Sequence, residues 1–281
     1  MSFYSGFCQT ETSYMGALKL NDSSFISYKL FVKEEGGKIS GYSVTDLGGS
    51  YETKSNISGS YSKNGELIFK EQGIVYTKSK VTQYDFCFVN FKGKLGKINS
   101  KKNINGKFKG LYADGKECIS GELTLVNIEK VQKKAISIDK KIQKSKKVSE
   151  DKKKQVNVLK SIDTLSMNVM KENQNMSMFT KSKTVKLTIY DSGKEDGDKV
   201  AIYVNKKKVL ADYIITKISK IIEIQIDSAE STVEIEALNE GEIAPNTANV
   251  EITDSENKIQ TVTKLKKGKR TRITIINPDI K

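Results

Sequence analysis

Gly106-Lys-Phe-Lys-Gly-Leu-Tyr-Ala-Asp-Gly-Lys-Glu-Cys-Ile-Ser-Gly-Glu-Leu-Thr-Leu-Val126 is the stretch that decides the fold of the first part of the chain. Two apolar runs flank Asp114-Gly115, and this dipeptide supplies the two positive-φ residues that a tight type I′ hairpin turn requires. In the first run Phe108 and Tyr112 fall on one face, because side chains alternate along an extended strand. The stretch therefore predicts an antiparallel β-hairpin.

The same signals recur throughout residues 1–126. Turn dipeptides such as Gly36-Gly37 and Asn64-Gly65 separate short apolar runs, among them residues 74–78 and residues 84–91. Strands spaced by about 8–12 residues are typical of an antiparallel sandwich or barrel. We expect an N-terminal antiparallel β-barrel or sandwich, and favour a closed meander because closure removes exposed edges.

Residues 127–154 change character, carrying 11 lysines and 4 acidic residues. Half of the net charge of +14 therefore lies in this segment. Its apolar residues follow helical spacing: Ile128, Val131, Ala135, Ile138 and Ile142. The segment predicts either a short amphipathic helix or a mobile Lys-rich linker. A basic amphipathic helix can lie on anionic lipid, so contact with a membrane surface is one expectation for this segment.

Residues 155–281 return to short alternating strands, for example Ile222-Glu-Ile-Gln-Ile and Val233-Glu-Ile-Glu-Ala. Such alternation places one face of a strand on a core and the other in water. Seven or more strands of this kind predict a β-sandwich. The sequence thus predicts an all-β protein with an N-terminal domain (1–126), a linker (127–154) and a C-terminal sandwich (155–281).

The composition excludes several functional classes. The chain of 281 residues has no His, which removes Ser-His-Asp and Cys-His catalysis and His-ligated zinc. Of its 48 basic residues only Arg270 and Arg272 are Arg, whereas sequence-reading nucleic-acid proteins favour Arg. Neither a G-x-S-x-G elbow nor a phosphate-binding loop is present, so we expect no catalysis and no nucleic-acid partner.

The three cysteines bear on the compartment. Cys87 and Cys118 fall in strand-like segments and Cys8 lies near the start of the chain. The pattern fits either a Cys87–Cys118 disulfide or free buried thiols. The first residues do not read as a signal peptide. We therefore expect either an intracellular protein or an exported one whose signal peptide has been removed.

The acidic loop Tyr190-Asp-Ser-Gly-Lys-Glu-Asp-Gly-Asp-Lys-Val200 is the sharpest local motif. Asp191, Asp196 and Asp198 offer oxygen ligands for Ca²⁺, although Ile202 stands where an EF-hand has its bidentate Glu. The alternative is an acidic hairpin turn in which Asp caps backbone amides. If this loop meets a second polar loop, the two can form a ligand site, with these candidates: Asn205, Asn239, Asn246 and Thr247.

Both halves of the chain resemble a group of exported two-domain β proteins of Bacteroidota. The likeness rests on a "DxGxxDGD" turn with a following "VN" at residues 191–205, and on a "GxIxPNTA" loop at residues 241–248. In the first half it rests on "GYSVTDL" (41–47), "FCF" (86–88) and "DGKECISGEL" (114–123). The resemblance implies export to the periplasm or cell surface, and it implies no reaction.

These observations favour a non-catalytic, exported interaction protein, an accessory or structural subunit of a bacterial cell-envelope assembly with an envelope protein as partner. The alternative is a Ca²⁺-dependent glycan-binding protein that uses the acidic loop. A lipid carrier with its ligand inside a closed barrel is a third interpretation, from fold analogy alone.

Overall fold

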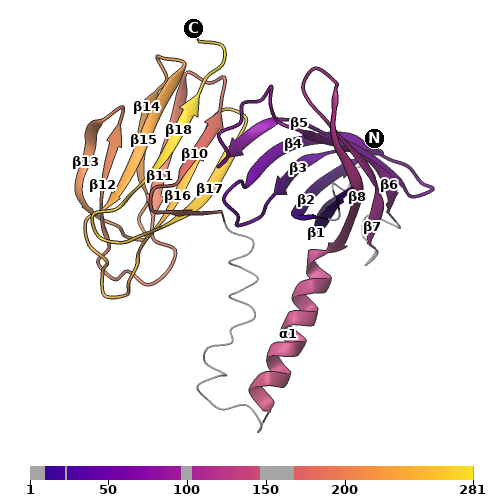
Figure 1. The fold of residues 1–281 in the computed structure, drawn as a ribbon. Coiled ribbons are helices and arrows are strands. Elements are labelled where there is room, and N and C mark those ends of the chain that lie inside the picture. Colours follow the sequence, from indigo (N-terminus) through magenta and orange to yellow (C-terminus); the bar gives the residue numbers. More distant parts are fainter. Residues whose placement is uncertain (1–9, 23, 96–102, 146–167, 281) are drawn as a thin grey trace, which may run out of the picture. The chain divides into compact units, whose positions relative to one another are not determined.

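The computed structural model describes residues 10–22, 24–95, 103–145 and 168–280. Within these ranges the regular structure comprises eighteen strands and one helix, so the all-β prediction is confirmed. The chain divides into two compact units (Figure 1). Unit 1 comprises Met1–Gly73 and Val81–Ser166, and unit 2 comprises Ile74–Lys80 and Met167–Lys281.

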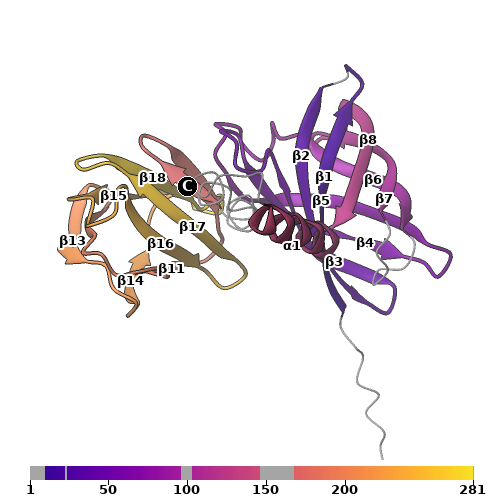
Figure 2. The ribbon, with the colours of Figure 1, turned by 90° about the horizontal axis from the view of Figure 1, so that it is seen from below.

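Unit 1 contains an eight-stranded antiparallel barrel. Its strands are β1 (Thr10–Leu20), β2 (Phe25–Glu35), β3 (Lys38–Thr45), β4 (Thr53–Tyr61), β5 (Glu66–Thr77), β6 (Phe88–Leu95), β7 (Ile104–Leu111) and β8 (Glu117–Asn127). Each strand pairs with the next along the chain, and β8 pairs back with β1 (Figure 2). The meander is therefore closed, as the sequence predicts, and the barrel has no free edge.

The barrel interior is a packed core of large side chains. Tyr28 and Leu30 of β2 are both 0% exposed, whereas the residues that alternate with them are partly exposed. The Phe91 ring fills the space above two paired glycines, because a Cβ on Gly93 would lie 2.4 Å from Phe91 Cζ and one on Gly106 would lie 2.7 Å from it. An aromatic ring packed over glycines is a known device for curving a sheet into a barrel.

Strand β6 begins later than the alternation of residues 84–91 predicts. Thr82 Oγ1 accepts a hydrogen bond from Tyr84 N at 3.3 Å and donates one to Asp85 Oδ2 at 2.7 Å. Tyr84 is 82% exposed in the resulting turn, and the strand starts at Phe88. Side-chain capping by Thr82 and Asp85 thus outweighs the apolar alternation at this point.

Helix α1 (Ile128–Lys144) follows β8 directly and contacts β1 and β8. Its first turn is capped by Asn127, whose side chain accepts a hydrogen bond from Glu129 N at 3.0 Å. Lys141 and Lys144 lie in the last turn, where the helix dipole favours positive charge. The helical interpretation of residues 127–154 is therefore confirmed for these residues, and the Lys152–Lys154 run lies outside the described residues.

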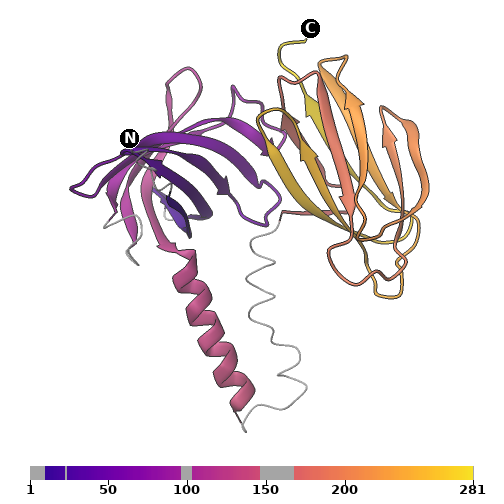
Figure 3. The ribbon, with the colours of Figure 1, turned by 180° about the vertical axis from the view of Figure 1, so that it is seen from behind.

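Unit 2 is a two-sheet sandwich (Figure 3). Its strands are β9 (Val169–Lys171), β10 (Asn175–Phe179), β11 (Thr184–Tyr190), β12 (Lys199–Val204), β13 (Lys207–Ile214), β14 (Lys220–Gln225), β15 (Glu230–Ala237), β16 (Asn246–Thr253), β17 (Lys258–Leu265) and β18 (Arg270–Ile276). One sheet has the order β13-β12-β15-β18-β10 and the other β14-β11-β16-β17-β9. The predicted alternation places Val233, Ile235 and Ala237 in the core, all 0% exposed.

Residues 74–80 belong to unit 2, although the sequence places residues 74–78 in the first domain. Strand β5 reaches them past Gly73, which has a positive φ of 73° that favours glycine. Tyr76 then pairs with Met178 of β10 and is buried in the unit 2 core. Lys78 Nζ donates a hydrogen bond to Val169 O at 2.9 Å. The end of β5 therefore adds a further strand to the β10 edge of the unit 2 sheet.

Candidate functional site

Three loops gather at one end of the unit 2 sandwich, which we call the loop end. They connect β11 to β12, β13 to β14 and β15 to β16, at residues 191–198, 215–219 and 238–245. Two backbone hydrogen bonds of 2.8 Å join the first loop to the second, from Asp191 N to Thr216 O and from Ile215 N to Asp198 O. Main-chain hydrogen bonds thus hold the acidic loop against the loop at residues 215–219.

The acidic loop also meets the second polar loop that the sequence singles out. Asn239 Nδ2 donates to Gly197 O at 2.8 Å, and Glu242 N donates to Asp196 O at 2.9 Å. Ile243 N donates to Asp196 Oδ2 at 3.1 Å. The loop end is therefore one hydrogen-bonded assembly built from separate parts of the sequence.

Asp198 and Asn246 are the buried polar residues of this assembly. Asp198 is 2% exposed, and its Oδ2 accepts a hydrogen bond from Thr247 N at 2.7 Å. Asn246 is 0% exposed and donates to Asn239 O at 3.1 Å. Asp198 Oδ1 and Asn246 Oδ1 have no hydrogen-bond partner. Burial, together with the nearby charges of Asp196 and Asp191, raises the pKa of Asp198 to about 6.

The three carboxylates proposed for Ca²⁺ each contact backbone amides. Asp191 Oδ1 accepts from Gly193 N at 2.6 Å, and Asp196 and Asp198 accept from the second polar loop as described above. Among the described residues no group of three or more Cys, Asp or Glu side chains is arranged to hold a metal ion. These contacts are the ones expected of an acidic turn in which Asp side chains cap backbone amides, the alternative to a calcium site. Calcium binding stays a prediction.

The predicted ligand residues divide into two places. Asn239, Asn246 and Thr247 come together beside Asp198 at the loop end. Asn205 does not join them, because it lies in the turn at the other end of β12. There its Oδ1 accepts a hydrogen bond from Thr232 N at 2.8 Å, and its φ of 49° fits a tight turn. Asn205 is thus a turn residue, and the grouping of all four residues in one site is wrong.

Exposed isoleucines at the loop end escape sequence reasoning. Ile218 is 80% exposed in the second loop and Ile243 is 56% exposed in the third. Ile214 and Ile221, which border the second loop, are 50% and 57% exposed. Large apolar side chains gathered at one end of a scaffold can mark a binding surface, whereas exposed apolar residues scattered singly are normal. A sequence signal exists for Ile221, because the alternation of Ile222-Glu-Ile-Gln-Ile places it on the polar face of that strand with Glu223 and Gln225.

The charge around these isoleucines is negative. The three loops carry six carboxylates against two lysines, Lys194 and Lys217. Lys194 is paired with Glu242 at 3.2 Å, and the backbone N–H of Lys217 donates a hydrogen bond to Glu195 Oε1 at 2.5 Å. The loop end therefore combines exposed isoleucines with loops of net negative charge.

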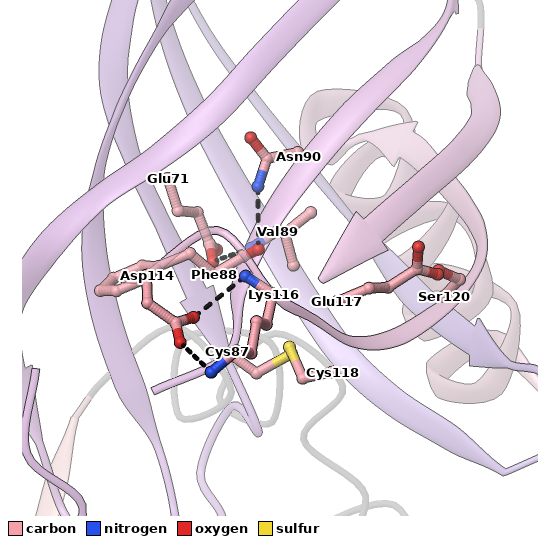
Figure 4. Close-up of a disulfide and its surroundings, with 10 residues drawn as sticks. All are labelled: Glu71, Cys87, Phe88, Val89, Asn90, Asp114, Lys116, Glu117, Cys118 and Ser120. Atoms are coloured by element: carbon pink, nitrogen blue, oxygen red, sulfur yellow. Dashed lines mark hydrogen bonds and ion pairs between the residues drawn. A yellow bond between two sulfur atoms is a disulfide. The ribbon is translucent and has the colours of Figure 1, made fainter. Parts of the chain in front are cut away.

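Unit 1 holds a disulfide between Cys87 and Cys118, as one of the two cysteine interpretations predicts (Figure 4). The Cα atoms are 6.1 Å apart. Cys118 is the extra residue of a bulge in β8, and the bond passes over Gly110 of β7, where a Cβ would lie 2.4 Å from Cys87 Sγ. A disulfide of this kind indicates an oxidising compartment outside the cytoplasm.

A buried carboxylate lies near the disulfide (Figure 4). Glu71 Oε1 accepts hydrogen bonds from Tyr28 Oη at 2.9 Å and from Ser43 Oγ at 2.6 Å. Its Oε2 accepts from Val89 N at 2.7 Å. Burial raises the pKa of Glu71 above its ordinary value, and these hydrogen bonds oppose the shift. The network ties four strands of the barrel together through one side chain.

The two arginines of the chain are both used inside unit 2. Arg270 Nη2 lies 2.8 Å from Glu236 Oε2, and its guanidinium carbon lies 4.4 Å from the centre of the Tyr203 ring. Arg272 Nε donates to Glu234 Oε1 at 3.0 Å. These ion pairs link β18 to β15, so both planar guanidinium groups stabilise the pairing of these two strands.

No protein-family model, curated protein or solved structure matches the chain. The resemblance to exported Bacteroidota proteins therefore stays a prediction. Among the described residues, none of the helical structure is both long and apolar enough to cross a membrane.

Proposed function

We propose that the protein is a non-catalytic binding protein of the periplasm or cell surface, an accessory or structural subunit of a bacterial envelope assembly. The observation that carries the proposal is the group of four exposed isoleucines at the loop end of unit 2, at residues 214, 218, 221 and 243. The disulfide of unit 1 supports the extracytoplasmic placement.

The loop end has the properties of a preorganised binding surface. Its loops are joined by backbone hydrogen bonds and by Asp196, Asp198 and Asn239, so little ordering is needed on binding. A surface that is already ordered loses less conformational entropy in a complex. Rigid loops on a sandwich scaffold are a common way to present binding residues.

The partner chemistry follows from the surface. Ile218 and Ile243 offer apolar area to the centre of an interface, and the surrounding carboxylates offer a negative rim. The complementary surface is an apolar patch on a protein, flanked by lysine or arginine side chains. The 127–154 segment takes no part in this contact.

The test uses the full chain with Ile218→Ser and Ile243→Ser combined. Tyr84→Ser is the matched control, because Tyr84 is 82% exposed in unit 1. A partner is captured from the native envelope fraction, identified by mass spectrometry, purified and titrated calorimetrically. We expect the isoleucine variant to bind at least about tenfold more weakly, and the control to bind like wild type. Recovery of the native protein only as a free monomer, or equal affinity of all three proteins, overturns the proposal.

The second candidate is Ca²⁺-dependent glycan binding at the loop end. It is supported by Asp198 Oδ1 and Asn246 Oδ1, two buried acceptor oxygens that lack a donor. Calcium takes six to eight oxygen ligands, in proteins at about 2.3–2.6 Å. A melting temperature of unit 2 that is unchanged by Ca²⁺ and by EDTA, in wild type and in Asp198→Asn, eliminates this candidate. A Ca²⁺-specific rise that Asp198→Asn abolishes supports it.

A further inference from the structure

The outer face of the barrel carries a groove that neither the sequence motifs nor the loop end accounts for. It lies over β4 to β7 and has a volume of about 570 Å³. The strand register places Ile68 of β5, Lys92 of β6 and Lys107 of β7 in one row across it. Lys70 and Lys109 lie in the next row, with Asn90 between them. Alternation points all of these side chains outward, because Phe69, Phe91 and Phe108 fill the interior.

The groove is strongly basic. Four lysines line it (Lys70, Lys92, Lys107 and Lys109), and none of its lining residues is acidic. Lys92 is paired with Glu66 and Lys109 with Glu117, each at 3.3 Å, from outside the groove. Lys70 and Lys107 form no ion pair with any described residue. Lys107 is also the direct cross-strand partner of Glu122 of β8. The four groove lysines are thus accompanied by three neighbouring carboxylates, those of Glu66, Glu117 and Glu122, which leaves the groove with a net positive charge.

One pair of lysines is placed at an energetic cost. Lys92 and Lys107 are direct cross-strand partners. Like charges directly opposite each other destabilise a sheet, whereas cross-strand pairs elsewhere contribute favourably. An anion bound between the two ammonium groups turns this repulsion into two favourable interactions.

The floor of the groove is apolar. Ile68 is 40% exposed and Leu111 is half-buried. The aliphatic stems of the lysines line the walls, because a lysine can cover apolar surface while its ammonium group stays in water. Simple phosphate would leave Ile68 uncovered, and a nucleic-acid backbone is read more often by arginine. The volume falls within the range of about 300–1,000 Å³ that is usual for small-ligand sites.

We propose that this groove binds a free amphiphilic anion, with a carboxylate or phosphate head between Lys92 and Lys107 and an aliphatic body along Ile68 and Leu111. The site is in unit 1, so it is independent of the loop end of unit 2. The ligand is monomeric, since the groove has room for one small molecule.

The experiment titrates the full chain with dodecyl phosphate below its micellar concentration. Inorganic phosphate and a neutral dodecyl glycoside serve as comparison probes. We expect dodecyl phosphate to bind, at least about tenfold more tightly than either comparison probe. We expect Lys92→Gln with Lys107→Gln to weaken it at least about tenfold, and Ile68→Ser to weaken it while leaving any phosphate binding unchanged.

The matched control is Lys207→Gln with Lys220→Gln, which removes the same charge from exposed positions in unit 2. The control should bind like wild type. Without ligand, the groove variant should melt at about the same temperature as wild type, because the like-charge pair and the exposed Lys92–Glu66 ion pair are lost together. An unchanged melting temperature also shows that the variant folds. Equal losses in groove and control variants, equal binding of inorganic phosphate, or binding only to vesicles of phosphatidylglycerol each overturns the proposal.

Discussion

The two units deal with the same problem, the unpaired edge of a β-sheet, in different ways. The barrel closes through the β8–β1 pair, so each of its strands has two neighbours. In unit 2, β13 and β14 stand at the ends of their sheets in the described structure. Strand β13 is irregular and has Asp212 at a φ of 47°, with Lys207 and Lys208 exposed. Bulges and edge lysines discourage pairing with another chain.

The difference between a closed barrel and an open sandwich decides which surfaces each unit has for binding a ligand. The barrel interior is filled by side chains such as Tyr28, Phe69 and Phe91, so a ligand would bind on the outer face. A sandwich has its loop ends as well, and its loop end carries the exposed isoleucines. The interpretation of the barrel as an internal lipid carrier gains no support from this packed core.

The largest expected difference between the units comes from the disulfide. Cys87 and Cys118 are separated by 31 residues, and closing a loop of that length contributes roughly 3.5 kcal/mol in the chain-entropy model. Replacing both with Ser should lower the free energy of unfolding of unit 1 by about this amount and leave unit 2 unchanged. Hydrogen exchange read by mass spectrometry separates the two units, since the chain has no Trp. An equal loss of protection in unit 2 would contradict the independence of the units.

Strand β5 allows a second comparison within a single strand. Leu67 is 0% exposed in the barrel core and Val75 is 2% exposed in the unit 2 core. Leu67→Ala should destabilise unit 1 by about 3 kcal/mol, and Val75→Ala should destabilise unit 2 by about 2 kcal/mol. The same exchange experiment locates each loss. If both substitutions weaken only the barrel, residues 74–80 do not belong to unit 2.

Glu71 makes the stability of unit 1 depend on pH. Its pKa is raised by burial above the ordinary 4.5, so the folded state binds its proton more tightly than the unfolded state. The resulting stabilisation is complete below about pH 4.5 and is lost as the pH rises through the folded pKa. Glu71→Gln removes this dependence and costs about 1–2 kcal/mol, because an amide N–H then faces Val89 N–H.

The measurement for Glu71 is urea unfolding of both proteins between about pH 4 and pH 8. The stability advantage of wild type over Glu71→Gln should shrink as the pH increases. An advantage that grows with pH would mean that Glu71 is held ionised, with its pKa lowered. Unit 2, where Asp198 has a pKa of about 6, should change with pH equally in both proteins, which hydrogen exchange can check.

The smallest expected effect concerns the sheet face of unit 2. Arg272→Lys removes the planar contact with Glu234, leaving a single point charge. Since Arg272 is largely exposed, the loss should be about 0.5–1 kcal/mol and should decrease at high salt. Thermal unfolding at low and high salt checks both statements. Lys186→Gln is the control, since its pair with Glu223 at 3.7 Å is looser.

Local sequence patterns predict the strands well where turns and alternation agree. Asp114-Gly115 lies at the turn between β7 and β8, and Val233 and Ile235 of β15 face the core. The patterns fail where distant pairing decides the outcome. Residues 74–78 read as a strand of the first domain, but only the long-range pairing of Tyr76 with Met178 assigns them to unit 2.

The candidate site was predictable only in part, for a related reason. The sequence did not predict whether the two polar loops meet, because their contact depends on β11 and β16 being neighbours in the sheet. Ile221 falls on the polar face of the alternating run at residues 222–226 and Ile218 lies outside that run, but the alternation does not show that the two exposed side chains lie at the same end of the sandwich. Asn205 follows a strand just as Asn239 does, yet the direction of β12 takes it to the opposite end of the sandwich.

The Cys87–Cys118 disulfide also limits how far the chain of unit 1 can be extended under tension. Helix α1 starts at the residue after β8, so a pull on the helix peels β8 from its neighbours. When peeling reaches Cys118, the load passes through the covalent bond to Cys87, so the chain between the two cysteines is not extended. At about 3.4 Å per residue, the 31-residue span withholds roughly 100 Å of chain that the reduced protein would release. The fully extended oxidised protein is therefore shorter than the reduced one by this length.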